Sequence, residues 1–313
     1  MLFKSSAVLS RREALCGGLL ACFGASYLRS SRAADSPRSA PLITKTIPSS
    51  GEKIPAIGLG TDSFRTSESD AIRDEIKRMH ELSGSVIDTA AAYGDSEALI
   101  GDALATLGVR DQMFIATKLT ADGFFGGGGE ASFNRSLERL KTQRIDLLQV
   151  HNLNGVDSLM PLLQQWKKAG KIRYLGVTTS RVAQHGDIVE AMRKYPLDFI
   201  QVDYSIANRD AAAGVFPVAL ERRIAVLANL PLARAALIGQ AGERKLPDWA
   251  ADIDVSSWSQ FFLKYVISHP AVTCAIPGST KVAHLEDNQA AARGRLPDAE
   301  TRSKMEKFWD GMA

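Results

Sequence analysis

Residues 86–97 read VIDTAAAYGDSE, and this stretch decides the fold because it joins a short apolar run to a polar end. Asp88 lies near the end of that run, and Tyr93 follows it. Two later runs repeat the pattern: MFIATKL at 113–119 carries Lys118 near its end, and IDLLQVH at 145–151 ends in His151. Short runs that are apolar along their length are typical of parallel strands buried on both faces.

Five further apolar runs complete a series of eight candidate strands. They lie at 57–60, 174–178, 199–204, 225–230 and 273–278. Segments with helical spacing of apolar residues lie between them, at 67–82, 130–140, 156–168 and 211–222. Repeated alternation of strand and helix predicts an α/β fold, a (β/α)8 TIM barrel over residues 41–313. An open doubly wound sheet is the competing architecture.

Three other segments carry weaker signals. Residues 41–55 predict a small N-terminal β-hairpin with Ser50 and Gly51 at its turn. The glycine run 126–129 predicts a flexible loop. The connection 232–255 lacks periodicity and is either a lid over a site or a plain surface insertion.

The N-terminal residues 1–36 predict a signal peptide and linker of the twin-arginine type. Arg11 and Arg12 precede a weakly apolar run at 15–28, which is too short to span a bilayer comfortably. We therefore expect export by the twin-arginine machinery to the periplasm, with no stable membrane span in the mature chain. Cleavage before Ala34, a lipid anchor on Cys22, an uncleaved anchor and a disordered tail remain open. A non-functional signal would leave the protein in the cytoplasm.

Composition excludes several classes of function. The formal net charge of +3 is too small to indicate a nucleic-acid partner. Two of the three cysteines lie in the N-terminal segment, so a processed chain keeps only Cys274 and forms no internal disulfide. The five histidines show no metal-ligand spacing, so no metal site is expected. The Gly-x-Ser-x-Gly elbow of many hydrolases is also missing.

Polar residues at successive strand ends indicate catalysis, because barrel enzymes place catalytic groups there. Each residue alone also has a structural explanation. Together, a Lys118 ammonium should lower the pKa of Tyr93, while Asp88 holds the ammonium in place and keeps it charged. His151 could orient a carbonyl oxygen by a hydrogen bond. Such a set would protonate an oxygen on which negative charge develops, as hydride addition to a carbonyl requires.

The ordered motifs resemble those of the aldo-keto reductase family. DTAAAYGDSE at 88–97 is similar to the family signature. Matching segments follow at 115–118, 136–140, 147–151, 176–178 and 276–280, so that the resemblance spans roughly residues 42–292. It implies a (β/α)8 barrel that binds NADP(H) in extended form. It also implies that Tyr93 is the general acid, tuned by Lys118 and Asp88, and that His151 orients the substrate.

The resemblance also implies a cofactor site. The residues expected to bind the cofactor are Thr61, Thr178, Gln201, Ser279, Thr280, Lys281, His284 and Asn288. Lys281 and His284 could meet a 2′-phosphate, which favours NADP (NADPH) over NAD. The Gly-x-Gly-x-x-Gly fingerprint is absent, as expected for this family.

Three positions depart from the family pattern and make the nicotinamide pocket unusual. Thr178 and Thr179 replace the usual Ser-Asn pair, Asn229 stands where an aromatic residue is common, and Gly278 stands where lysine is common. The function expected is NADPH-dependent reduction of aldehyde or ketone carbonyls to alcohols. The alternative is a nucleotide-binding regulatory or sensor protein on the same barrel with little catalysis.

Overall fold

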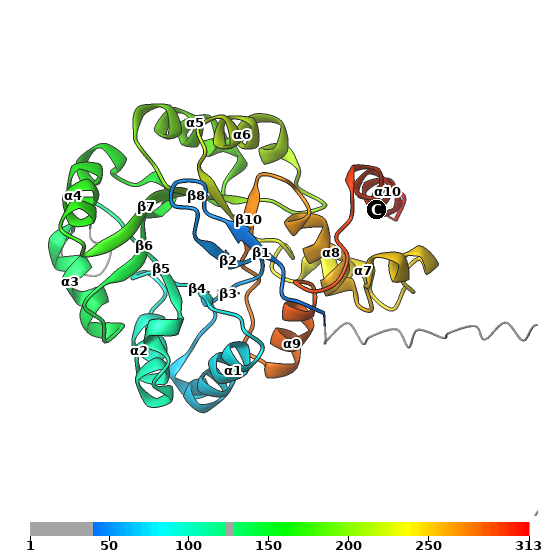
Figure 1. Ribbon diagram of the computed structural model, residues 1–313, viewed down its shortest axis with the longest axis horizontal. Coiled ribbons are helices and arrows are strands. Elements are labelled where there is room, and N and C mark those ends of the chain that lie inside the picture. Colours follow the sequence, from blue (N-terminus) through cyan, green and yellow to red (C-terminus); the bar gives the residue numbers. More distant parts are fainter. Residues whose placement is uncertain (1–39, 123–127, 313) are drawn as a thin grey trace, which may run out of the picture. The chain divides into compact units, whose positions relative to one another are not determined.

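The computed structural model describes residues 40–122 and 128–312, which include eight parallel strands paired in chain order (Figure 1). The strands are β3 (Leu59–Gly60), β4 (Val86–Asp88), β5 (Phe114–Leu119), β6 (Ile145–Val150), β7 (Ile172–Thr178), β8 (Phe199–Asp203), β9 (Ala225–Asn229) and β10 (Val272–Ala275). This confirms the predicted α/β fold with eight parallel strands. The predicted signal peptide lies outside the described residues, as do Gly126 and Gly127 of the glycine run.

The two edge strands of this sheet meet. Parallel bridges join Ile57 to Ala275 and Gly60 to Gly278. The amide of Gly58 donates to the Ala275 carbonyl at 2.8 Å, and the amide of Gly60 donates to the Pro277 carbonyl at 3.0 Å. A Cβ atom at Gly60 would lie only 3.0 Å from the Ile276 carbonyl oxygen, so a glycine lets the strands approach. The sheet therefore curls round on itself, and its carboxyl edge forms a ring.

Four of the helices lie where the spacing predicts them, near 67–82, 130–140, 156–168 and 211–222. The α-helices are α1 (Ser69–Glu81), α2 (Ser96–Leu107), α3 (Glu130–Arg139), α4 (Val156–Lys168), α5 (His185–Lys194), α6 (Asp210–Glu221), α7 (Ala236–Ala241), α8 (Trp258–Ile267), α9 (Val282–Ala290) and α10 (Ala299–Asp310). Short 3₁₀ helices are η2 (Thr66–Glu68), η3 (Arg110–Gln112), η4 (His151–Leu153), η5 (Val182–Gln184) and η6 (Asp248–Ile253). The connection 232–255 thus contains α7 and η6. None of the helices within the described ranges is long and apolar enough to cross a membrane.

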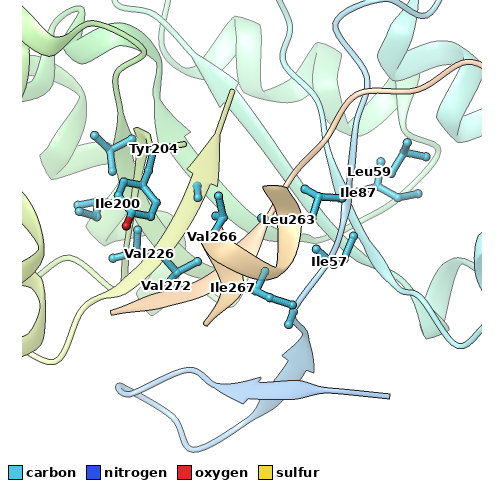
Figure 2. Packing of buried hydrophobic residues seen from close by; sticks show 14 of the residues in the cluster. Ile57, Leu59, Ile87, Ile200, Tyr204, Val226, Leu263, Val266, Ile267 and Val272 are labelled. Atoms are coloured by element: carbon cyan, nitrogen blue, oxygen red, sulfur yellow. The ribbon is translucent and has the colours of Figure 1, made fainter. Parts of the chain in front are cut away.

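Apolar side chains fill both sides of the sheet. Outside it, Leu263 and Ile267 of α8 pack with Val226 of β9 and Val272 of β10 in a continuous core (Figure 2). Inside it, a second cluster gathers residues that alternate along the strands, among them Phe114, Leu147, Tyr174 and Phe199. The antiparallel pair β1 (Thr44–Thr46) and β2 (Lys53–Pro55) adds Ile54 to that cluster, and Ile47 between them also joins it. The interior is packed below the ring, so polar chemistry is confined to the carboxyl ends of the strands.

Two helical glycines provide a test of this packing. A Cβ atom at Gly101 of α2 would lie 2.1 Å from the Arg139 carbonyl, whereas at Gly214 of α6 it would meet nothing within 4 Å. Gly101→Ala should lower the free energy of unfolding by roughly 1–3 kcal/mol through this clash. The matched change Gly214→Ala should raise it by about 0.5–1 kcal/mol, because alanine suits a helix interior better than glycine. Urea unfolding of both variants tests this, and equal effects would contradict the packing of α2 against the end of α3.

Candidate active site

A cavity of about 710 Å³ lies at the carboxyl ends of the strands. Nearly all of the predicted site residues line it: Thr61, Asp88, Tyr93, His151, Thr178, Gln201, Ser279, Thr280, Lys281, His284 and Asn288. Lys118 does not line the cavity but lies beneath its lining residues, where it is almost completely buried. The fold therefore brings together residues that the sequence spreads over most of the chain.

A buried ion pair forms the floor of the site. Lys118 Nζ lies 2.7 Å from Asp88 Oδ2 and also donates to the Thr89 carbonyl at 2.7 Å. Burial by itself lowers the pKa of Lys118, but the Asp88 carboxylate and the Tyr93 phenol outweigh it, so that this pKa is raised. The ammonium stays charged. An ammonium has three N–H groups, and the third is left for the side on which Tyr93 lies, 5.0 Å away at its ring centre.

The pKa of Tyr93 differs from the sequence-based prediction that Lys118 lowers it. It is raised, not lowered, because burial of the phenol outweighs the nearby Lys118 ammonium, and the Asp88 and Asp62 carboxylates add to the rise. The contribution of Lys118 alone does lower this pKa, as predicted. Burial was the missing quantity, since the sequence does not show how far water reaches the phenol. Tyr93 is therefore a protonated phenol at neutral pH.

His151 lies at the edge of the Tyr93 ring, with ring centres 5.8 Å apart in a T-shaped arrangement. Burial, together with a smaller contribution from the Lys118 charge, lowers the pKa of His151 to about 4. The imidazole is therefore neutral near pH 7 and carries one N–H donor. Such a group can hold a carbonyl oxygen without competing with Tyr93 as the acid.

Hydrogen bonds extend the ion pair across the ring of strands. Gln201 Nε2 donates to Asp88 Oδ1 at 2.9 Å, and Thr178 Oγ1 donates to Gln201 Oε1 at 2.8 Å. These contacts fix which end of the Gln201 amide faces which strand. Thr61 Oγ1 donates to the Asp88 carbonyl at 3.0 Å and accepts from Ser96 Oγ at 2.8 Å. The Thr61 hydroxyl thus holds the end of β4 in place.

The two unusual positions near the predicted nicotinamide pocket contact each other. Asn229 lines the cavity and donates from Nδ2 to the Thr179 carbonyl at 2.9 Å. The Thr179 hydroxyl turns away and donates to Gln184 Oε1 at 2.6 Å. Thr179 is fully buried, so its side chain offers nothing to the cavity.

A basic helix start without a side-chain cap also borders the cavity. No side chain caps the start of α9. The amide of His284 donates to the Lys281 carbonyl at 3.0 Å, which leaves the N–H groups of Val282 and Ala283 to face an anion. Lys281 and His284 line the cavity there, beside Thr280 and Asn288. Cation, hydroxyl, amide and helix dipole together form a donor set that suits a phosphate group.

Sequence reasoning missed several residues that line the cavity, namely Asp62, Ser63, Asn152, Ser180 and Arg234. Asp62 and Ser63 follow the first strand directly, so the strand-end rule could have found them. Arg234 forms an ion pair with Asp62 at 2.7 Å. Nothing in the sequence pattern indicated Arg234 as a site residue, because it lies in the aperiodic connection 232–255. Among the described residues, no group of three or more histidine, cysteine or acidic side chains could hold a metal ion.

Comparisons with known proteins show the family and the fold of the chain. Residues 56–308 match the model of the Aldo/keto reductase family. The chain is 32% identical over 280 residues to the uncharacterized oxidoreductase Rv2298 of Mycobacterium tuberculosis, covering 77% of this chain and 85% of that protein. It is 29% identical over 272 residues to methylglyoxal reductase YeaE of Escherichia coli, covering 82% and 92%. An aldo/keto reductase of Klebsiella pneumoniae, solved with NADP and acetate, shares the fold with a TM-score of 0.74 at 23% identity, covering 85% and 95%.

The ion pair predicts a large loss of stability when one partner is removed. Lys118→Met should lower the free energy of unfolding by roughly 3–5 kcal/mol, because Asp88 is left as an uncompensated buried charge. The double variant Lys118→Met/Asp88→Asn should lose less, since neither side chain is then charged. Lys141 and Asp102 form an exposed pair at 2.7 Å, and Lys141→Met is the control, with a loss below about 1 kcal/mol. Equal losses for the two lysine variants in urea unfolding would contradict this assignment.

Proposed function

The chain belongs to the aldo/keto reductase family, and on that premise we propose that it reduces aldehyde or ketone carbonyls to alcohols with NADPH. The observation that carries the proposal is the network of Tyr93, Lys118, Asp88 and His151 at one end of the cavity. A phenol beside a buried ammonium and a neutral imidazole is a donor set for a developing alkoxide.

The residues at the other end of the cavity fit the cofactor. Lys281 and His284, with the start of α9, suit the 2′-phosphate that distinguishes NADPH from NADH. Gln201 and Thr178, near Tyr93, would hold the nicotinamide carboxamide. The similar Klebsiella pneumoniae fold was solved with NADP, which supports the choice of cofactor. When bound, NADPH supplies the hydride that reduces the carbonyl carbon.

Tyr93 supplies the proton. His151 donates its N–H to the carbonyl oxygen and orients it beside the phenol. As negative charge develops on that oxygen, the O–H bond of Tyr93 breaks and its proton completes the alcohol. The phenolate that remains lies beside the Lys118 ammonium, which stabilises it, and Asp88 keeps that ammonium charged. Tyr93 then regains a proton from solvent.

Removal of this acid is the test of the proposal. Tyr93→Phe should lower kcat for NADPH-dependent aldehyde reduction by roughly 10²–10⁴-fold, with NADPH affinity nearly unchanged. Tyr195→Phe is the matched control, because Tyr195 is a tyrosine whose hydroxyl contacts the distant Asp157. Its kcat should equal that of the unmodified chain. If the unmodified chain binds NADPH yet reduces no carbonyl across a broad panel, the regulatory or sensor function replaces this proposal.

We also propose that the chain is exported by the twin-arginine machinery, a proposal that rests on Arg11 and Arg12 ahead of the apolar run 15–28. Arg11→Lys/Arg12→Lys should move the protein from the periplasmic to the cytoplasmic fraction of a bacterium that expresses the full chain. The matched pair Arg29→Lys/Arg32→Lys should leave its location unchanged. A cytoplasmic location for the unmodified chain would contradict export.

A further inference from the structure

Glu75 of α1 is a buried carboxyl group without a hydrogen-bond partner. Its side chain is 0% exposed, and neither Oε1 nor Oε2 makes a hydrogen bond to any described residue. Burying an unpaired carboxylate costs far more than burying a neutral acid. An apolar side chain would pack in this position without that free-energy cost, so packing alone does not explain a glutamate here.

The packing of α1 against α9 places Glu75 at the same height as the start of α9. Helices α1 and α9 lie side by side and both run back from the carboxyl edge of the sheet, so they are parallel (Figure 1). Arg78 Nε and Glu286 Oε1, 2.6 Å apart, fix their register. Glu75 lies about one turn before Arg78, and Lys281 and Val282 lie about one turn before Glu286.

Ser279 is the polar group that links Glu75 to the cavity. Its hydroxyl is close enough to lower the pKa of Glu75, although it makes no hydrogen bond to that carboxyl group. On its other side, Ser279 Oγ donates to the Lys281 carbonyl and accepts from the Lys281 amide, both at 3.1 Å. This turn leads into the uncapped start of α9, where Lys281 and His284 line the cavity. Glu75 therefore lies behind the basic side of the cavity, at Ser279 and Lys281.

We propose that Glu75 is a positioning residue for the 2′-phosphate of NADPH: the neutral acid supports phosphate binding and the carboxylate opposes it. The inference rests on the proposed function, because it assumes that this end of the cavity receives the phosphate. A neutral Glu75 can donate to Ser279 Oγ and leave the turn into α9 intact. An ionised Glu75 draws the Ser279 hydrogen away from Lys281 and adds a negative charge behind the phosphate.

The sign of the pH dependence follows from the surroundings of Glu75. Burial raises its pKa to about 7, the Ser279 hydroxyl lowers it, and Glu68 raises it. The other charged groups on neighbouring helices are engaged elsewhere: Glu97 with Thr117, Asp102 with Lys141, and Glu286 with Arg78. Glu75 is thus neutral below pH 7 and ionised above it, so affinity for NADPH falls as the pH rises through 7.

Binding of NADPH and NADH to the full chain at pH 6 and pH 8 tests the proposal. NADH is the matched ligand, because it lacks the phosphate. At pH 8, Glu75→Gln should bind NADPH at least about threefold more tightly than the unmodified chain, and at pH 6 about equally. NADH affinity should be unchanged by this substitution. Titration of the phosphate itself affects both proteins alike, so the difference between their affinities isolates the contribution of Glu75.

One control variant and one second variant keep the outcome decisive. Glu190→Gln, at an exposed position of α5, should behave as the unmodified chain. Glu75→Met also removes the charge and serves as a second variant if Glu75→Gln does not fold. Equal NADPH affinities at pH 8 for the unmodified chain and the charge-removing variant would overturn the inference. Absence of NADPH binding at both pH values would instead refute the proposed function on which it rests.

Discussion

A buried ion pair, with Lys118 Nζ 2.7 Å from Asp88 Oδ2, is the contact on which the site depends. Moving an ammonium and a carboxylate out of water costs several kcal/mol for each ion, so both must be fully bonded. Lys118 satisfies a second donor at the Thr89 carbonyl, and Asp88 accepts from Gln201. These requirements tie β4, β5 and β8 together at their carboxyl ends. The position of Tyr93 over the ammonium follows from that constraint.

The fold was predictable because parallel strands buried on both faces must be apolar along their length. That rule located all eight strands, since the runs ending near Asp88, Lys118 and His151 stand out from the helical spacing between them. The polar residues at the strand ends could be recognised for the same reason. A charged residue inside such a run would be buried, so one at the end of a run is expected at the carboxyl edge of the sheet. The spacing predicted α1, α3, α4 and α6. The connection 232–255 showed no period because α7 and η6, of about six residues each, are too short to show one.

The pKa shifts depend on burial, which could not be predicted from the sequence. The direction of the Tyr93 pKa shift depends on how much water reaches the phenol, and burial outweighs the ammonium beside it. The sequence does show that Glu75 is unusual. It lies one helical turn from both Ile72 and Met79, and so on the apolar face of α1. A charged residue on a buried stripe is the kind of local conflict that marks a functional or strained position. Its position behind Ser279 could come only from the packing of α1 on α9.

The two positions that depart from the family pattern, Thr179 and Asn229, lie next to each other in the fold. Asn229 donates to the Thr179 carbonyl across β9 and the end of β7, and a phenyl or indole ring at 229 could not make that bond with an amide group. Thr179 in turn directs its hydroxyl to Gln184, away from the cavity. Neither change touches β4 or β5, which carry Asp88 and Lys118. Both positions therefore lie apart from the Lys118–Asp88 ion pair, whose hydrogen bonds do not involve them.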